Sequence, residues 1–410
     1  MIRTLETENL RGKTLRKFLT LYPDTYNIYK NIKHQVENTN CDYHLENDLW
    51  AHTMMVYNNI ELNEKNNILN TLNLIIALTH DYGKIYTREI NEKTRRPQFK
   101  SHENHSVQFC YDVIYDMFNF DLDTSENSIL GSYAKEILGS LLIVNNHMKL
   151  YTYLENSRKN KNYNLIDKIM SMYNYNKETA IRAINFGIAD KTGSISIDKV
   201  DYDILYHMEK LKEDIQYQKG IDEFKNPEFE KYDLVMVAGT SGVGKNTFYE
   251  TNLRKLGFKL LSYDNITLEK FYEHNNLIMQ NDYKYYEDAF NFSFNSSDID
   301  IKQILIDRAV QELKSGNKVA IVNTHLTKKS RRGVINVIKN NNALKDSKYM
   351  CIYLMDHSKN IIKKNENRKD KELTKKHYIN MMRRQSIPNL SEDYFEGTFV
   401  VFVLDDECDI

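Results

Sequence analysis

The pattern of hydrophobic and polar positions changes near the middle of the chain. Up to about residue 215, apolar residues recur at helical spacing, most clearly over 66–79, 102–117 and 133–145. This half contains no convincing run of alternating strand residues. We therefore predict an all-helical domain over residues 1–215.

The second half alternates between short apolar runs and helix-like stretches. Runs rich in β-branched and aromatic residues cover 234–238, 259–263, 319–323, 349–355 and 399–404. Strands that alternate with helices form a parallel sheet with crossover helices. A polar stretch with Pro227 precedes them. We therefore predict a linker over 216–231 and an α/β domain over 232–410.

Composition and charge narrow the class of protein. The chain of 410 residues is 41% hydrophobic and 28% charged, as expected for folded domains that stay in solution. Its formal net charge is −1, so binding to nucleic acid would need local basic patches. Scattered cysteines, a polar N-terminus and short apolar runs favour a cytoplasmic protein without disulfides, leader or membrane segment.

A glycine-rich turn joins the first predicted strand of the second half to the helix after it. Segment 234–247 reads LVMVAGTSGVGKNT and fulfils the pattern G-x-x-x-x-G-K. In such a loop the backbone N–H groups and the helix dipole face phosphates, and the lysine reaches the β- and γ-phosphates. We predict an ATP site formed by Gly239, Thr240, Ser241, Gly242, Val243, Gly244, Lys245, Asn246 and Thr247, with Lys245 also catalytic.

Asn246 departs from this motif, which normally has Ser or Thr as the Mg²⁺ ligand at that position. An amide oxygen can also ligate a hard cation. We therefore expect ATP and Mg²⁺ to be the cofactors of this domain, with the role of Asn246 left open.

Polar side chains follow the next two predicted strands. Asp264 stands where the second strand ends, and a carboxylate there can accept the proton of an attacking hydroxyl. A helix N-cap is the structural alternative. After the third strand come four cations that would either hold an acceptor or form a solvated helix face: Lys328, Lys329, Arg331 and Arg332.

These segments together resemble the polynucleotide 5′-kinase branch of the P-loop kinases. Asp264 in S-Y-D matches that family's general base, Asn323-Thr324-His325 its N/D-T-N segment, and Lys364-Asn365 with Arg368 its lid. The resemblance implies that Arg368 is catalytic. The departures are Asn246, His325 for Asn, Lys364 for the first lid arginine, and Thr267 for an arginine beyond the base.

Histidines and aspartates with metal-ligand chemistry recur along the helical half. Residues 77–84 read ALTHDYGK, with His52 upstream and His102, His105, His147 and Asp190 downstream. Imidazoles with carboxylates bind Mn²⁺, Ni²⁺, Co²⁺, Fe²⁺ or Zn²⁺, and two such ions can activate water against a phosphate.

The order of these residues resembles the HD phosphohydrolase superfamily. The resemblance implies one metal held by His52, His80, Asp81 and Asp190, and a second by Asp81, His102 and His147, with Asp81 and Lys84 catalytic. His105 lies one turn from His102 and competes for its role. Arg88, Arg95 and Arg96 either reach the pocket or lie in a solvated loop. The remaining histidines outside both motifs are expected to be structural or on the surface: His34, His44, His207, His274, His357 and His377.

The two halves together resemble the HD-domain polynucleotide kinases. This implies an enzyme that phosphorylates 5′-hydroxyl ends of RNA or DNA with ATP and removes 3′-phosphates or 2′,3′-cyclic phosphates, preparing ends for a polynucleotide ligase. One alternative is a small-molecule nucleoside or nucleotide kinase fused to an HD nucleotidase, which the basic stretches disfavour. Another is a non-catalytic ATP-gated binding module, against which the retained Lys245, Asp264 and histidine set argue.

Overall fold

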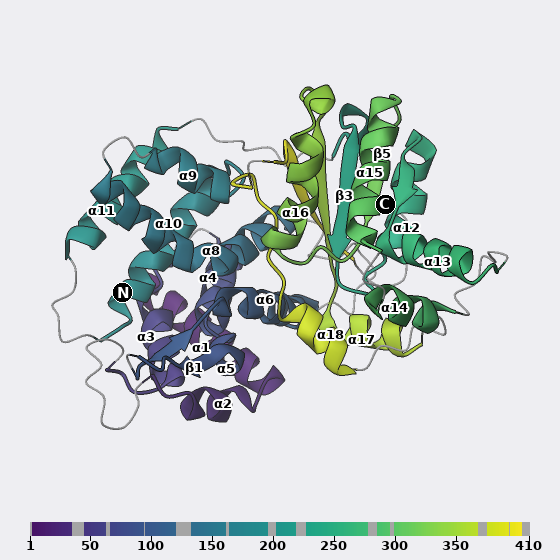
Figure 1. The fold of residues 1–410 in the computed structure, drawn as a ribbon. Coiled ribbons are helices and arrows are strands. Elements are labelled where there is room, and N and C mark those ends of the chain that lie inside the picture. Colours follow the sequence, from purple (N-terminus) through teal and green to yellow (C-terminus); the bar gives the residue numbers. More distant parts are fainter. Residues whose placement is uncertain are drawn as a thin grey trace. The chain divides into compact units, whose positions relative to one another are not determined.

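The structure is a computed structural model, shown in Figure 1. It describes residues 2–34, 45–62, 66–93, 95–119, 133–160, 164–195, 202–218, 227–277, 285–295, 299–367, 375–392 and 394–403. The chain divides into two compact units, Met1–Phe224 and Lys225–Ile410. The first unit is helical and the second is an α/β domain, so the predicted fold class is confirmed.

The helical unit is built around α4 (Asn67–Thr79). This helix packs against α1 (Ile2–Leu21), α3 (Leu49–Asn59), α6 (His102–Asn119), α8 (Ala134–Lys159) and α10 (Lys177–Thr192). The Asn66 side chain begins α4 by accepting from the backbone N–H groups of Ile68 and Leu69. Most of the helix is buried, and the residues that follow its C-terminal end therefore lie in the interior of the unit.

The other described elements of this unit are four helices and a pair of short strands. They are α2 (Thr25–Asn31), α5 (Lys84–Thr87), α9 (Leu165–Met172), α11 (Tyr202–Gln216) and an antiparallel pair, β1 (Arg88–Ile90) with β2 (Pro97–Phe99). The β1–β2 hairpin was not predicted, because its strands have three residues each and show no alternation of apolar positions.

The α/β unit has a parallel five-stranded sheet in the order β4-β5-β3-β6-β7. The strands are β3 (Leu234–Gly239), β4 (Lys259–Leu261), β5 (Val319–Val322), β6 (Tyr349–Met355) and β7 (Gly397–Phe402), close to the predicted runs. The three central strands, β5, β3 and β6, are buried along their whole length, as expected when helices cover both faces of a parallel sheet.

The helices of this unit connect successive strands (Figure 1). The chain after β3 forms α12 (Lys245–Phe248), which continues as a π-helical turn and a 3₁₀ turn to Leu256, so the strand leads into helical backbone as predicted. The later helices are α13 (Tyr263–His274), α14 (Tyr286–Asn295), α15 (Ile301–Lys314), α16 (Lys328–Lys339), α17 (Ser358–Glu366) and α18 (Lys375–Met382). Among the described residues, no helix is long and apolar enough to cross a bilayer.

Candidate active sites

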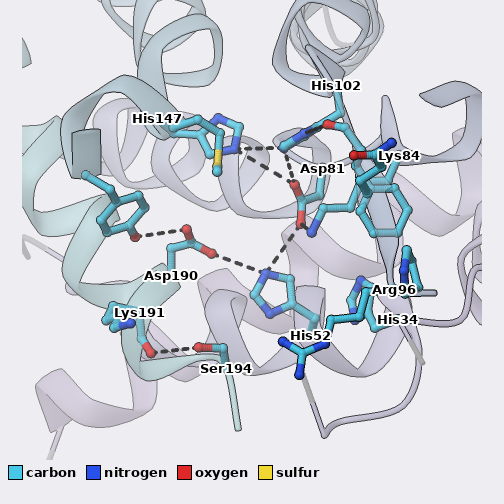
Figure 2. A pocket seen from close by; sticks show the side chains of 15 residues that line it. His34, His52, Asp81, Lys84, Arg96, His102, His147, Asp190, Lys191 and Ser194 are labelled. Atoms are coloured by element: carbon cyan, nitrogen blue, oxygen red, sulfur yellow. Dashed lines mark hydrogen bonds and ion pairs between the residues drawn. The ribbon is translucent and has the colours of Figure 1, made fainter. Parts of the chain in front are cut away.

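The helical unit gathers the predicted metal-site residues around one pocket, and all of them except His80 line it (Figure 2). Each comes from a different part of the sequence: His52 from α3, His80 and Asp81 from the turn after α4, His102 from the first turn of α6, His147 from the middle of α8, and Asp190 from the last turn of α10. All but Asp190 are buried. The fold therefore brings the whole predicted set together.

Asp81 lies between two pairs of imidazoles. Its Oδ1 is 2.9 Å from His102 Nε2 and 3.9 Å from His147 Nε2. Its Oδ2 is 3.4 Å from His52 Nε2 and 3.3 Å from His80 Nε2. The ligand atoms form two groups around this carboxylate, and within each group they lie within 4.8 Å of one another. A carboxylate with one oxygen in each group has the geometry of a ligand that bridges two metal ions.

Each of these four imidazoles is oriented by a backbone carbonyl. A ring nitrogen that donates to a carbonyl carries the proton, so the other nitrogen keeps a lone pair for a metal. In every case Nδ1 faces the carbonyl and Nε2 faces the cluster. The pairs are His52 with Gly193 (3.2 Å), His80 with Ala77 (3.0 Å), His102 with Phe99 (2.7 Å) and His147 with Val144 (2.8 Å).

Asp190 completes the first group of ligand atoms. Its Oδ1 lies 3.2 Å from His52 Nε2 and 3.6 Å from His80 Nε2. Its Oδ2 accepts a hydrogen bond from the Tyr151 hydroxyl at 3.0 Å. Tyr151 thus holds the carboxylate in place. Tyr151 lies outside the predicted set, although it stands one helical turn after His147 on the same helix.

Charge in the pocket is balanced between carboxylates and cations. Burial would raise the pKa of Asp81, but Lys84 and His80 outweigh it and hold that pKa well below its usual value. Burial, together with His102 and His80, lowers the pKa of His147 to about 3, so this ring is neutral. Burial lowers the pKa of His80, yet Asp81 and Asp190 raise it to about 10. The two carboxylates therefore attract positive charge to the position between them.

A buried set of imidazole nitrogens and ionised carboxylates fits divalent transition metals. The pocket around it has a volume of about 440 Å³, which suits a small ligand. Lys84 lies deep in it, with Nζ 2.6 Å from Asp81 Oδ2. An ammonium group at this depth can neutralise a phosphate placed beside the cluster.

Two further residues near the cluster lay outside the predicted set. Glu46 Oε1 is 3.3 Å from His52 Nδ1 and 3.6 Å from His34 Nδ1, and all three side chains are buried. His34, which was expected to be structural or on the surface, is buried and lines the pocket. No spacing in the sequence indicates either residue, since both precede the motif that contains His52.

The sequence left open which of His102 and His105 is the ligand, and whether the three nearby arginines reach the pocket or lie in a solvated loop. His102 lies in the cluster, whereas the ring of His105 stacks on Tyr86 at 6.2 Å between ring centroids. Arg96 lines the pocket. Arg88 is exposed and donates from Nε to the carbonyl of Lys33, and Arg95 is exposed.

In the α/β unit, the predicted phosphate loop runs from the end of β3 into α12. The loop needs glycine, because Gly242 has φ +80° and a Cβ there would lie 2.3 Å from Asn365 Nδ2. Lys245 Nζ donates to the carbonyls of Gly239 and Thr240 at 3.1 and 2.6 Å. Asn246 and Thr247 are exposed in the first turn of α12. The loop residues therefore lie between the C-terminal end of β3 and the start of α12.

Hydrogen bonds connect the C-terminal ends of β3, β4 and β5 beside this loop. The backbone N–H of Tyr263 donates to Asn323 Oδ1 at 2.8 Å, and that of Gly239 donates to the Thr324 carbonyl at 3.0 Å. Ser262 caps α13 by accepting from the N–H of Asn265. The N-cap is therefore Ser262, and Asp264 lies two residues later in the first turn, half-buried.

The predicted lid segment is only partly described. Asn365 is buried and its Nδ2 donates to the Ser241 carbonyl of the phosphate loop at 2.8 Å. Lys364 Nζ lies 3.0 Å from Oδ2 of the buried Asp356. Arg368, the predicted catalytic residue of the lid, lies outside the described residues.

The four cations after β5 are not equivalent. Lys329 and Arg332 are exposed. Arg331 is fully buried: its Nε donates to Glu392 Oε2 at 3.0 Å, its Nη2 also contacts Glu392, and its Nη1 donates to the carbonyls of His325 and Ser386. Both expectations for Arg331, an acceptor contact and a solvated position, are wrong, because its guanidinium is fully buried and these partners take its N–H groups.

Comparison with known proteins identifies the type of the second unit. Residues 234–388 match the family model described as an AAA domain, which shows a P-loop kinase domain and implies ATP and Mg²⁺. No curated protein matches the chain.

Solved structures that are similar to part of the chain include a "putative kinase" from Chloroflexus aurantiacus j-10-fl and a gluconokinase from Sinorhizobium meliloti 1021. They are 15% and 12% identical, cover 42% and 43% of this chain and 85% of their own chains, and give TM-scores of 0.29 and 0.25.

Proposed function

We propose that the chain is a bifunctional enzyme that heals nucleic-acid ends. The kinase unit would transfer the γ-phosphate of ATP to a 5′-hydroxyl of RNA or DNA, and the helical unit would remove a 3′-phosphate or a 2′,3′-cyclic phosphate. The observation that carries the proposal is the pairing, in one chain, of a P-loop kinase domain with a pocket where Asp81 lies between four imidazoles. The products would suit a polynucleotide ligase.

In the helical unit, His52, His80, Asp81 and Asp190 would hold one metal ion, and Asp81, His102 and His147 a second. Such ions activate water and neutralise a phosphate when bound. The protein's part is to fix the ligands: backbone carbonyls orient the four rings, and Tyr151 orients Asp190. Lys84 would bind the phosphate. This ligand set favours Mn²⁺, Ni²⁺, Co²⁺, Fe²⁺ or Zn²⁺ over Mg²⁺.

In the kinase unit, Asp264 would accept the proton of the attacking hydroxyl and Lys245 would stabilise the transferring phosphoryl group. Asn246 would hold Mg²⁺ directly or through water. Arg368 would close over the phosphates as part of the lid.

The second candidate is a small-molecule nucleoside or nucleotide kinase fused to an HD nucleotidase. Two contacts favour it, because they reduce the cationic surface open to an acceptor strand: Arg331 is buried on Glu392, and Lys364 is paired with Asp356. A mononucleotide needs less positive surface than a strand.

One experiment separates the two candidates. The full chain is incubated with Mg²⁺ and [γ-³²P]ATP, together with either a 5′-hydroxyl oligonucleotide or free nucleosides. In parallel, 3′-phosphorylated oligonucleotides are tested with Mn²⁺, Ni²⁺ or Mg²⁺ after chelation of trace metals. We expect label on the oligonucleotide and 3′-phosphate release with the transition metals. Label on nucleosides alone would establish the second candidate, and full hydrolase activity with Mg²⁺ alone would contradict the ligand set.

A further inference from the structure

One wall of the metal pocket is formed by the β1–β2 hairpin, an element that no motif predicted. Four consecutive residues of this hairpin line the pocket: Arg96, Pro97, Gln98 and Phe99. The tip is closed by backbone hydrogen bonds between Asn91 and Arg96 at 2.9 Å and between Arg95 and Asn91 at 2.8 Å. The hairpin is therefore an ordered wall that a ligand in the pocket would contact.

This wall is joined to the metal-site residues through Phe99. Its carbonyl accepts from His102 Nδ1 at 2.7 Å. Its ring lies 5.3 Å from Lys84 Nζ and 6.0 Å from the ring of His34. These contacts fix the hairpin beside the position where a phosphate would be hydrolysed. Arg96 stands three residues before Phe99 and lines the same pocket.

The cationic side chains of the pocket lie at two depths. Lys84 is buried against Asp81, whereas Arg96 is exposed and Lys191 half-buried (Figure 2). Arg96 comes from the hairpin and Lys191 from α10, so the outer cations come from different elements lining the pocket. Metal ions held by the cluster, together with Lys84, would neutralise one terminal phosphate. A guanidinium further out fits a second phosphate, because its planar fork binds phosphate oxygens in pairs.

We infer that Arg96 binds the phosphodiester next to the terminal 3′-phosphate, and so makes the hydrolase site prefer oligonucleotide ends over mononucleotides. This inference rests on the proposed function and names its substrate class more narrowly: a strand of at least two nucleotides with a 3′-phosphate.

The test compares two substrates that differ in one phosphodiester. A dinucleotide 3′-phosphate has the inner phosphate, and a nucleoside 3′-monophosphate lacks it. For Arg96→Ala we expect kcat/KM on the dinucleotide to fall about tenfold or more, the effect of losing a charge-assisted hydrogen bond, with little change on the mononucleotide. Arg96→Lys should recover part of the loss. The matched control is Arg95→Ala, because Arg95 is the exposed neighbour that does not line the pocket.

Salt dependence gives a readout that a merely structural effect would not change. On a longer 3′-phosphorylated strand, the slope of log(1/KM) against log salt should become shallower by about 0.7 in Arg96→Ala, the value for one phosphate contact on single strands. Bound metal should equal that of the unmodified protein.

The outcomes distinguish the inference from the function on which it rests. If Arg96→Ala affects both substrates equally or affects neither, Arg96 does not read the inner phosphate and the inference is overturned while the proposed function stands. If the unmodified protein hydrolyses p-nitrophenyl phosphate but neither 3′-phosphate, the proposed function fails and the inference fails with it.

Discussion

Arg331 and Arg332 are neighbours in the sequence but occupy opposite environments. Arg331 lies in the interior on Glu392, and Arg332 lies on the surface. Helical periodicity could have separated them, because the buried residues of α16 are Arg331, Val334, Ile335 and Ile338, spaced i, i+3, i+4 and i+7. The run of positive charges suggested a cationic helix face. The position of each arginine on the helix, however, determines that Arg331 is buried and Arg332 is exposed.

The first prediction at this scale concerns stability. Arg331→Ala should lower the free energy of unfolding of the α/β unit by about 3–5 kcal/mol, since it leaves the Glu392 carboxylate buried without its partner. Arg332→Ala should change it by less than about 0.5 kcal/mol. Urea unfolding of the full chain measures both. Equal stability of the two variants would show that Arg331 is not a structural ion-pair partner.

The second prediction concerns Glu46, which contacts His52 on the side away from the cluster. Groups that orient a ligand histidine strengthen metal binding by about 10–100-fold, so Glu46→Gln should weaken binding of Mn²⁺ by an amount in that range. Calorimetric titration of the full chain measures it, with the exposed Glu61→Gln as control. Identical affinities in the two variants would remove Glu46 from the site.

The grouping of the predicted metal-ligand residues could be expected from the sequence, because their order and flanking motifs are local signals. Glu46, His34 and Tyr151 could not, because their roles depend on contacts that only the fold creates. The same holds for Arg96. The sequence allowed it to lie either in the pocket or in a solvated loop, and only the fold shows that it lines the pocket.

At the scale of elements, long or strongly patterned segments were predicted well. The predicted helix over 66–79 corresponds to α4 with Asn66 as its cap, and the predicted strand over 349–355 is β6. The β1–β2 hairpin was missed because its six strand residues are exposed or half-buried and lack an apolar face. Short elements of this kind are held by their neighbours rather than by their own pattern.

The contact between the phosphate loop and α17 yields the third prediction. Gly242→Ala places a Cβ 2.3 Å from Asn365 Nδ2, at a backbone φ of +80° that favours glycine. ATP turnover should therefore fall. In an Asn365→Ala background the clash disappears while the backbone strain remains, so the same change should cost less there.

A double-mutant cycle on the KM for ATP measures this coupling. Gly244→Ala serves as the control, because Gly244 also has positive φ but a Cβ at that position would have no atom within 4 Å. An effect of Gly242→Ala that is independent of residue 365 would show that strain, and not the contact with α17, accounts for the loss.

At the scale of the whole molecule, the change of hydrophobic pattern near residue 215 indicated two kinds of architecture, and the structure has a helical unit followed by an α/β unit. The two candidate sites are separated in the same way, since the histidine cluster lies within the first unit and the phosphate loop within the second. The substrate could not be determined in the same way. It depends on surface charges whose exposure the sequence does not specify, as Arg331 shows.

The last prediction follows from this division into units. Asp264→Ala should abolish phosphorylation of a 5′-hydroxyl oligonucleotide, since loss of a general base typically costs about 10²–10⁴ in rate, and should leave 3′-phosphate release unchanged. Asp81→Ala and the isosteric Asp81→Asn should do the reverse, because each removes the carboxylate between the four imidazoles. Both activities are measured on the same preparations, with circular dichroism to establish folding. If a folded variant of either aspartate lost both activities, the two reactions would share one site, and the assignment of one chemistry to each unit would have to be abandoned.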